Sequence, residues 1–234
     1  MNKKQKWILA AVFTAASIAN TVYQTGLQKP IKEKRRGDKP CVLCIGDSIT
    51  FGDGVRHKRE NCWVRVLENL FGGSMQILNY GICGATLQAE GDHPYDPRFW
   101  SAAREQRPDA VILMLGTNDS KPQNWNAERY ERQLREKLRD LENWENVRRI
   151  ILMLPPWCCG RKPGKKVMYK ISNEVIRDEI RPILRSVAEE KGLQVIDLYA
   201  LTEGHREYFG DGVHPNTLGN RVIAEHIHSE LKMK

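Results

Sequence analysis

Short apolar runs alternate with longer segments of helical periodicity from residue 41 to the end of the chain. The first run is bounded by Pro40 and Gly46, and such a run is typical of a strand buried on both faces of a parallel sheet. The five runs of this type are CVLCIG (41–46), QILNYG (76–81), AVILMLG (110–116), RIILMLP (149–155) and QVIDLY (194–199). They predict five parallel strands.

Between and after these runs, apolar residues recur at the three- and four-residue spacing of one helix face. The four sets are Trp63, Val66, Leu67 and Leu70; Tyr130, Leu134, Leu138 and Leu141; Ile176, Ile180, Ile183, Leu184 and Val187; and Leu218, Val222, Ile223, Ile227 and Leu231. Pro182 falls within the third set and is expected to kink or interrupt that helix. Strands that alternate with helices predict a doubly wound α/β sandwich, in which ligands bind at the carboxyl ends of the strands.

The first 37 residues differ from the rest of the chain. A basic start with Lys3, Lys4 and Lys6 precedes an apolar stretch, residues 7–19, which has the length of a signal-peptide core and is short for a membrane span of about 20 residues. We expect residues 1–37 to be a signal peptide or membrane anchor with a basic linker, and residues 38–234 to form one domain. This predicts a secreted or membrane-anchored protein outside the cytoplasm, with membrane association through the N-terminal segment. The alternative is a cytoplasmic protein whose N-terminal helix is packed or disordered.

The net charge of +8 is concentrated in that same segment. Residues 1–37 hold eight Lys or Arg and one Glu, a net of +7, which leaves +1 for residues 38–234. A nearly neutral body lacks the broad basic surface that phosphate backbones require, so nucleic acid is not an expected partner.

The six cysteines suit disulfides if the protein is exported. However, Cys41 and Cys44 are three residues apart in a predicted strand and therefore point to opposite faces, while Cys158 and Cys159 are adjacent. No second pair with zinc-finger spacing follows them. We expect most of the six, which also include Cys62 and Cys83, to be small buried side chains.

Polar residues gather where the predicted strands end. Ser48 follows the first strand, Gly81 closes the second, Asn118 follows the third, and GDGVHP (210–215) lies between the fifth strand and the last helix. Because the carboxyl ends of parallel strands meet at one edge of a sheet, we expect these four sites to converge.

The segments GDSIT, NYGICG, GTND and DGVHP, in that order, resemble the four sequence blocks of the SGNH or GDSL-like hydrolases, a family of esterases and acyl hydrolases. The resemblance spans about residues 41–231, and the order and spacing of the blocks agree as well as their residue types. The first block reads Gly-Asp-Ser-Ile in place of Gly-Asp-Ser-Leu, an exchange of one apolar residue for another. The resemblance implies a three-layer α/β/α sandwich with a five-stranded parallel sheet of flavodoxin-like order.

Carried onto this sequence, the family pattern makes Ser48 the nucleophile and completes its triad with Asp211 and His214. It places the oxyanion hole at the backbone N–H groups of Ser48 and Gly81 and at the side-chain amide of Asn118. The residue types suit these roles. A serine hydroxyl needs a nearby base such as His214, and a carboxylate three residues earlier on the same turn can hold the other ring nitrogen. Fixed N–H donors stabilise the negative charge of a tetrahedral intermediate.

Three aromatic residues lie in loops expected beside the nucleophile: Tyr95 and Trp100 in the first loop (86–100) and Trp125 in the second (119–125). They are candidates either for stacking on a sugar ring or for ordinary packing beneath the loops. Asp47, Asp119 and Asp197 adjoin strand ends and are expected to accept backbone N–H bonds.

The stretch GTNDSKPQNW resembles family members that act on acetylated carbohydrates, including sialate and xylan acetylesterases. We therefore expect a serine ester hydrolase that removes small acyl groups, above all acetyl, from a carbohydrate through an acyl-enzyme on Ser48. No cofactor and no metal are expected. A lipid or lysophospholipid acyl hydrolase and a non-catalytic carbohydrate-binding protein are the alternatives.

Overall fold

The computed structural model describes residues 32–232. Their five strands form one parallel sheet in the order β2-β1-β3-β4-β5. The strands are β1 (Cys41–Gly46), β2 (Gln76–Gly81), β3 (Ala110–Met114), β4 (Arg149–Leu154) and β5 (Gln194–Asp197). All five begin at the first residue of a predicted run, and β3, β4 and β5 end one or two residues before their runs do. The strand order is the flavodoxin-like one.

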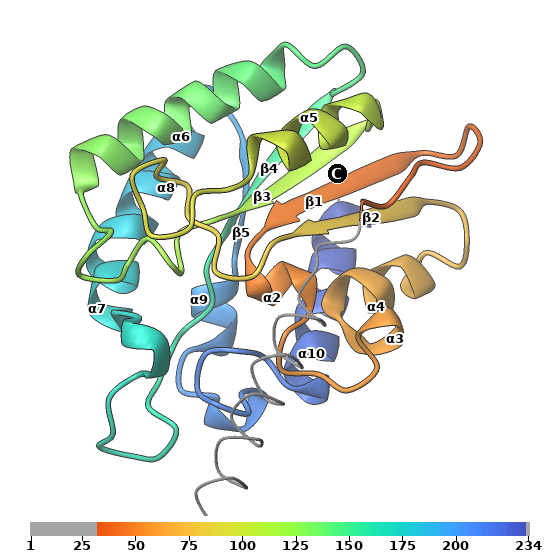
Figure 1. Cartoon of the computed structure of the whole chain (residues 1–234). Helices are drawn as coiled ribbons and strands as arrows, with labels where there is room; N and C mark the ends of the chain where they lie inside the picture. The colour runs from red at the N-terminus through yellow and green to blue at the C-terminus, as the bar shows by residue number, and fades with distance from the viewer. Residues whose placement is uncertain (1–31, 233–234) are drawn as a thin grey trace, which may run out of the picture. The chain divides into compact units, whose positions relative to one another are not determined.

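Helices cover both faces of the sheet (Figure 1). One layer consists of α5 (Pro97–Glu105), α6 (Ala127–Glu142), α7 (Asn173–Val175), the π-helical turn η2 (Ile176–Ile180) and α8 (Arg181–Lys191). The other consists of α2 (Ser48–Phe51), α3 (Lys58–Asn61), α4 (Trp63–Leu70), α9 (Leu198–Thr202) and α10 (Thr217–Lys232). Two 3₁₀ turns, η1 (Met168–Lys170) and η3 (Arg206–Tyr208), lie in connecting loops. The predicted three-layer α/β/α sandwich is confirmed.

Successive side chains of β1 point to opposite faces of the sheet, so this strand contributes to both hydrophobic cores. Leu43 and Ile45 pack with α5, α6 and α8, whereas Val42 and Cys44 pack with α4 and α10. Cys41 lies in the first of these cores, so Cys41 and Cys44 face opposite sides, as the strand pattern predicts. All six cysteines fall within the described residues and are free there, five of them buried and Cys83 partly exposed.

The helical periodicities are confirmed in α6, where Tyr130, Leu134, Leu138 and Leu141 are buried. They fail at two helix ends. Leu218, in the first turn of α10, is 51% exposed, and Leu70, the last residue of α4, is 38% exposed. A regular apolar pattern overestimates the buried face where a helix begins or ends.

Pro182 interrupts the α-helical hydrogen-bond pattern without ending the helix. It lies in the first turn of α8, directly after η2, and the flanking residues Val175, Ile180 and Arg181 keep right-handed helical dihedral angles. Proline lacks the N–H that an α-helical interior needs, and a π-turn changes the hydrogen-bond spacing at that point. The predicted interruption is therefore a local change of helix type.

Residues 33–36 lie against the folded unit. The Glu33 carboxylate pairs with Arg65 at 2.8 Å and accepts the N–H of Asn79, and Arg35 pairs with Asp109 at 3.1 Å. These residues belong to the segment that is expected from the sequence to be a basic linker, and the expected domain boundary at Asp38 stays a prediction. The predicted signal peptide or anchor concerns residues that lie almost entirely outside the described range.

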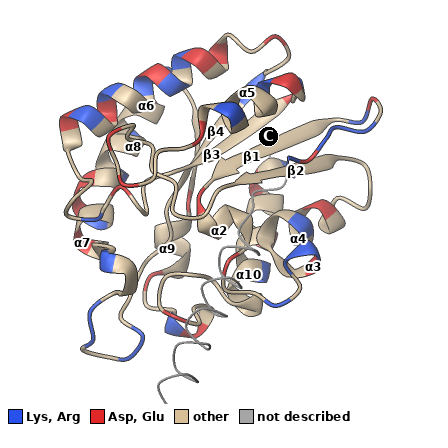
Figure 2. Ribbon diagram, in the orientation of Figure 1, with Lys and Arg blue, Asp and Glu red and all other residues tan. Residues whose placement is uncertain are grey.

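Charges of both signs alternate along α6 (Figure 2), which is typical of a solvated helix face. The loop residues 161–166 are all exposed and include Arg161, Lys162, Lys165 and Lys166. Within residues 32–232, no helix combines the length and the apolar character needed to span a membrane.

Candidate active site

Ser48 stands at the first position of α2, immediately after β1. Asp47 is the N-cap of this short helix, and its carboxylate accepts the N–H of Ile49 at 2.9 Å. This cap starts the helix directly behind the strand end and so fixes the backbone of Ser48 at the carboxyl edge of the sheet. Asp47 therefore has the structural role predicted for it.

Ser48, His214 and Asp211 form one hydrogen-bonded chain. Ser48 Oγ lies 2.9 Å from Nε2 of His214, and His214 Nδ1 lies 2.7 Å from Oδ2 of Asp211. The other carboxylate oxygen of Asp211 accepts the backbone N–H groups of Val213 and His214 at 2.9 and 2.8 Å. The structure thus brings together the three residues predicted for the triad, and the geometry is that of a nucleophile, a base and the group that orients the base.

The electrostatics of the pair favour an ionised Asp211. Burial raises the pKa of its carboxyl, but the hydrogen bond and positive charge of His214 and two backbone N–H groups outweigh burial, so the pKa lies well below its usual range. Burial alone lowers the pKa of His214, whereas Asp211, Asp53 and Asp47 raise it, and the net shift is upward. Asp53 Oδ2 lies 4.0 Å from Nε2 of His214.

Asn118 lies in the loop after β3 and is nearly fully buried. One hydrogen of its side-chain amide is donated to the carbonyl of Ala85 at 3.2 Å. Its backbone carbonyl accepts the side-chain amide of Asn124 at 2.9 Å. An amide nitrogen carries two hydrogens, so one remains free for a substrate oxygen, as the predicted oxyanion role requires.

Gly81 does not fit the role predicted for it. Its N–H donates to Oδ1 of Asn79 at 2.9 Å, and the residue is buried at the end of β2. A Cβ at this position would lie 2.2 Å from the backbone nitrogen of Phe51. Gly81 therefore serves the close packing of β2 against α2, and its N–H is not available to an oxyanion.

Gly84, which the sequence analysis did not single out, has the free backbone N–H that Gly81 lacks. It has φ +78° and directly precedes Ala85, whose carbonyl Asn118 contacts. A Cβ added to Gly84 would lie 3.7 Å from Cδ2 of His93. Its N–H has no hydrogen-bond partner among the described residues. The second glycine of NYGICG was the available signal, since a glycine in a loop often marks positive φ.

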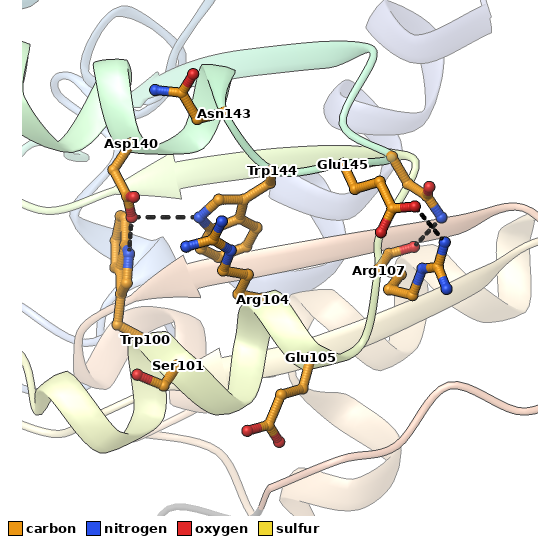
Figure 3. Close-up of a pocket in the computed structure, with 10 residues that line it drawn as sticks. Trp100, Ser101, Arg104, Glu105, Arg107, Asp140, Asn143, Trp144 and Glu145 are labelled. Carbon is orange, nitrogen blue, oxygen red and sulfur yellow. Dashed lines mark hydrogen bonds and ion pairs between the residues drawn. The ribbon is translucent and has the colours of Figure 1, made fainter.

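Tyr95 and Trp100 are buried in the core on the α5–α6 side of the sheet. Trp100 is 7% exposed and packs edge-on against Trp144, and Figure 3 shows the indole N–H groups of both residues directed at Asp140, in the last turn of α6. These residues help to line a cavity of about 550 Å³ between the ends of α5 and α6. Tyr95 is 6% exposed and donates its hydroxyl to the carbonyl of Tyr80. The predicted stacking roles of Tyr95 and Trp100 are wrong, because both rings are core residues.

Trp125 remains a candidate. It is partly buried, donates its indole N–H to Glu179 at 2.8 Å and packs against Tyr130 with ring centroids 5.4 Å apart. It follows Asn118 in the same loop region, so its predicted contact with substrate stays a prediction.

The other carboxylates near strand ends have the structural roles expected of them. Asp119 accepts the N–H groups of Leu87 and Gln88, both at 2.9 Å, and Asp197 caps α9 and pairs with Arg181 and Arg185. Among the residues described, no group of three or more His, Cys, Asp or Glu side chains is arranged to hold a metal ion.

Comparison with known proteins gives consistent matches. The family model described as GDSL-like Lipase/Acylhydrolase family matches residues 44–222. An acetylxylan esterase of Xylanibacter ruminicola is 34% identical over 212 residues, which make up 82% of this chain and 43% of that protein. The chain thus spans less than half of that relative's length.

Solved structures share the fold. A carbohydrate acetylesterase family member from Sinorhizobium meliloti superposes with a TM-score of 0.67 at 22% identity, covering 83% of this chain and 98% of the other. Axe2, an acetylxylan esterase from Geobacillus stearothermophilus, superposes with a TM-score of 0.65 at 22% identity, covering 85% and 96%.

Proposed function

The chain belongs to the GDSL-like lipase/acylhydrolase family, and we propose that it is a serine ester hydrolase that removes acetyl groups from a carbohydrate. The observation that carries the reaction class is the unbroken chain of contacts from Ser48 Oγ through His214 to Asp211. The acetylxylan esterase relative and the acetylesterase fold neighbours support the choice of acyl group and of a sugar alcohol.

In the acylation step, Ser48 Oγ attacks the ester carbonyl carbon while Nε2 of His214 accepts its proton. Asp211 stabilises the imidazolium, because its carboxylate stays ionised and accepts a hydrogen bond from the Nδ1–H group of His214. When the tetrahedral intermediate collapses, the electrons on the oxyanion re-form the carbonyl bond. The sugar alcohol then leaves with the proton from Nε2.

In the deacylation step, a water molecule attacks the acetyl-Ser48 carbonyl and gives a proton to Nε2. Collapse of the second tetrahedral intermediate breaks the bond to Oγ, which recovers its proton from His214, and acetate leaves. The residues therefore return to their starting protonation states, and no redox step is involved.

The oxyanion formed in both steps needs fixed N–H donors. We assign this role to the backbone N–H groups of Ser48 and Gly84 and to the side-chain amide of Asn118. The free N–H of Gly84 and its position beside the Asn118–Ala85 contact support this assignment. Each such donor is typically worth about 3 kcal/mol of activation free energy.

A chain-length series tests the proposal. Rates on p-nitrophenyl esters from acetyl to palmitoyl, together with acetate release from acetylated xylan, are measured for the full chain and for Ser48→Ala. We expect a strong preference for acetyl, release of acetate from the polysaccharide, and loss of both activities in Ser48→Ala. A preference for long chains would favour a lipid hydrolase instead, and equal rates in the two proteins would exclude Ser48 as the nucleophile.

Export or anchoring by the N-terminal segment is a further part of the proposal. Its support is the basic start and the apolar stretch of residues 7–19, followed by a basic segment. Fractionation of cells that produce the full chain, with N-terminal sequencing of the product, distinguishes a cleaved signal peptide, an anchor and cytoplasmic retention.

A further inference from the structure

A tyrosine from the loop between β4 and α7 contacts the Asp–His pair. Tyr169 donates its hydroxyl to Oδ2 of Asp211 at 3.1 Å, and the same oxygen lies 2.7 Å from Nδ1 of His214. The Tyr169 ring stands edge-on to the imidazole, with ring centroids 5.4 Å apart and an angle of 66° between the planes. One side chain therefore contacts both the orienting carboxylate and the base.

The backbone that presents this side chain is strained. Tyr169 and Lys170 both have φ +59°, in the left-handed region that residues with a Cβ rarely adopt. Such conformations persist where surrounding contacts enforce them, and they are concentrated at functional sites.

Contacts on both sides of Tyr169 hold the strained turn in place. Gly160 and Val167 form an isolated β-bridge before it, and the Ser172 N–H donates to Oγ of Ser120 at 3.1 Å after it. Ser120 belongs to the loop after β3 that also carries Asn118. The turn is thus fixed to the same edge of the sheet as the candidate active site.

The phenol is a stable donor at neutral pH. Burial raises the pKa of Tyr169 to about 12, and the negative charge of Asp211 acts in the same direction. With its proton retained, the hydroxyl adds a fourth hydrogen bond to a carboxylate that already accepts two backbone N–H groups and the imidazole N–H.

We propose that Tyr169 is a positioning residue for the proposed esterase reaction. Its hydroxyl fixes Oδ2 of Asp211 in the direction that holds Nδ1 of His214, and its ring restricts rotation of the imidazole. This inference rests on the proposed function, because it assigns to His214 the role of base. The side chain remains 52% exposed, so replacing it removes these contacts without opening a cavity in the core.

Removal of the Tyr169 hydroxyl should shift the pKa of His214 in a definite direction. The charged groups that face the imidazole are Asp211, Asp53, itself paired with Lys58, and the buried Asp47. Without the phenol, the charge on Asp211 is less well stabilised and attracts the imidazolium more strongly. Loss of the hydroxyl is therefore expected to raise the pKa of His214 and move the acidic limb of the pH–rate profile to higher pH.

The experiment uses the full chain with p-nitrophenyl acetate as substrate and compares Tyr169→Phe, Tyr169→Ala and Tyr208→Phe. Tyr208 is a matched control because it lies in η3, stacks on His205 and makes no hydroxyl bond to the triad. We expect Tyr169→Phe to lower kcat about tenfold with KM unchanged, the scale of one hydrogen bond to a charged group. Tyr169→Ala should lower kcat further because it also loses the ring, and Tyr208→Phe should match the parent protein.

The imidazole Nδ1–H proton resonance of His214, followed against pH by NMR, gives a readout that needs no substrate. A shifted His214 resonance and a raised His214 pKa in Tyr169→Phe, both absent in Tyr208→Phe, support the positioning role. They support it even if the parent protein hydrolyses no ester, and that absence of hydrolysis would overturn only the proposed function. An unchanged resonance and pKa, an active Tyr169→Phe with unchanged kcat and pH profile, or equal losses in the two phenylalanine variants would overturn the positioning role.

Discussion

At the scale of single residues, the protonation state of His214 depends on the carboxylates around it. Burial disfavours its protonated form, but Asp211, Asp53 and Asp47 together favour it, and the pKa rises above its usual value of about 6.5. A general base must be neutral to accept the Ser48 proton. Activity should therefore fall as the pH drops through a pKa above about 6.5, and hydrolysis should be fastest in neutral to alkaline solution.

Replacing Asp211 tests this assignment. Asp211→Asn removes the charge that raises the pKa of His214, so any residual activity should have its acidic limb at lower pH, and kcat should fall by about 10⁴. Asp53→Asn is the matched control: it removes a nearby charge without breaking the Nδ1 contact and should shift the limb with a much smaller loss of kcat. A pH–rate profile of each variant measures both effects, and an Asp211→Asn protein with parental kcat would assign the orienting role to another residue.

The proposed oxyanion donors give a second prediction. Asn118→Ala should lower kcat by about 10²–10³ with little change in KM, because the lost contact forms fully only in the transition state. Gly84→Ala should also lower kcat, since a residue with a Cβ disfavours φ +78° and would turn the N–H away.

Gly72→Ala controls for strain alone, because Gly72 has φ +57° and open space around it, in a turn after α4. It should cost stability without changing kcat. Steady-state kinetics on a short-chain ester compare the three variants. A parental kcat in Gly84→Ala would argue for a different backbone donor.

The site residues that the sequence predicts differ from those found only in the structure in how their contacts relate to position along the chain. Asp211 and His214 are three residues apart, so one turn brings them together, and Ser48 follows a strand end directly. Tyr169 reaches Asp211 from 42 positions away through a strained loop that no periodicity predicts. Gly81 and Gly84 lie in the same short segment, and the sequence does not show that Gly81 packs against α2 and donates its N–H to Asn79, whereas Gly84 has a positive φ and a free N–H.

At the scale of elements, a buried aspartate anchors the loop that carries Gly84 and Ala85 to the end of β3. The Asp119 carboxylate is fully buried and accepts the N–H groups of Leu87 and Gln88. Burial raises its pKa to about 6, partly opposed by those two hydrogen bonds. The charge is therefore unfavourable in itself, and the useful contribution of Asp119 is its pair of acceptor oxygens.

Asp119→Ala should destabilise the protein by about 2–4 kcal/mol, because two buried N–H groups lose their partners. Asp119→Asn keeps one acceptor oxygen and should be intermediate. Urea denaturation measures the free energy of unfolding, and limited proteolysis measures exposure of residues 86–96. If Asp119→Ala matched the parent in both measurements, other contacts would hold this loop.

The helices show how far apolar spacing predicts an element. The spacing placed α6 and α8 correctly, because a long helix against a sheet must bury one continuous stripe. It did not distinguish a kink from the π-turn η2 before Pro182, since both preserve the buried positions Ile176 and Ile180. Burial patterns report which face is covered and not how the hydrogen bonds are spaced.

At the scale of the whole folded unit, apolar runs predicted the five strands and their parallel direction, whereas the strand order came from the family resemblance. The contact of residues 33–36 with the unit was not predicted, because a basic segment without periodicity resembles a linker. The one signal was Glu33, the single acid among the basic residues, whose carboxylate lies between Arg65 and the N–H of Asn79 on β2. Its backbone carbonyl also accepts the Tyr80 hydroxyl at 2.7 Å.

These contacts predict different stabilities for two truncated chains. A chain that lacks residues 1–30 keeps the Glu33 and Arg35 contacts and should melt close to the full chain. A chain that lacks residues 1–37 leaves the Asn79 N–H without its acceptor and leaves the Tyr80 hydroxyl with only the longer contact to the carbonyl of Ala102 at 3.3 Å, a loss of about 2–3 kcal/mol. For a unit of this size that loss corresponds to a decrease in Tm of about 4–12 °C.

A point variant in the full chain separates the acceptor from the charge. Burial raises the pKa of Glu33 despite the opposing effect of Arg65, so the negative charge contributes little net stability. Glu33→Gln keeps an acceptor oxygen for Asn79 and should melt near the parent, whereas Glu33→Ala should show part of the loss seen on removal of residues 1–37. Calorimetry compares the full chain with the four variants. Equal Tm values for the two truncated chains would mean that residues 31–37 do not stabilise the fold.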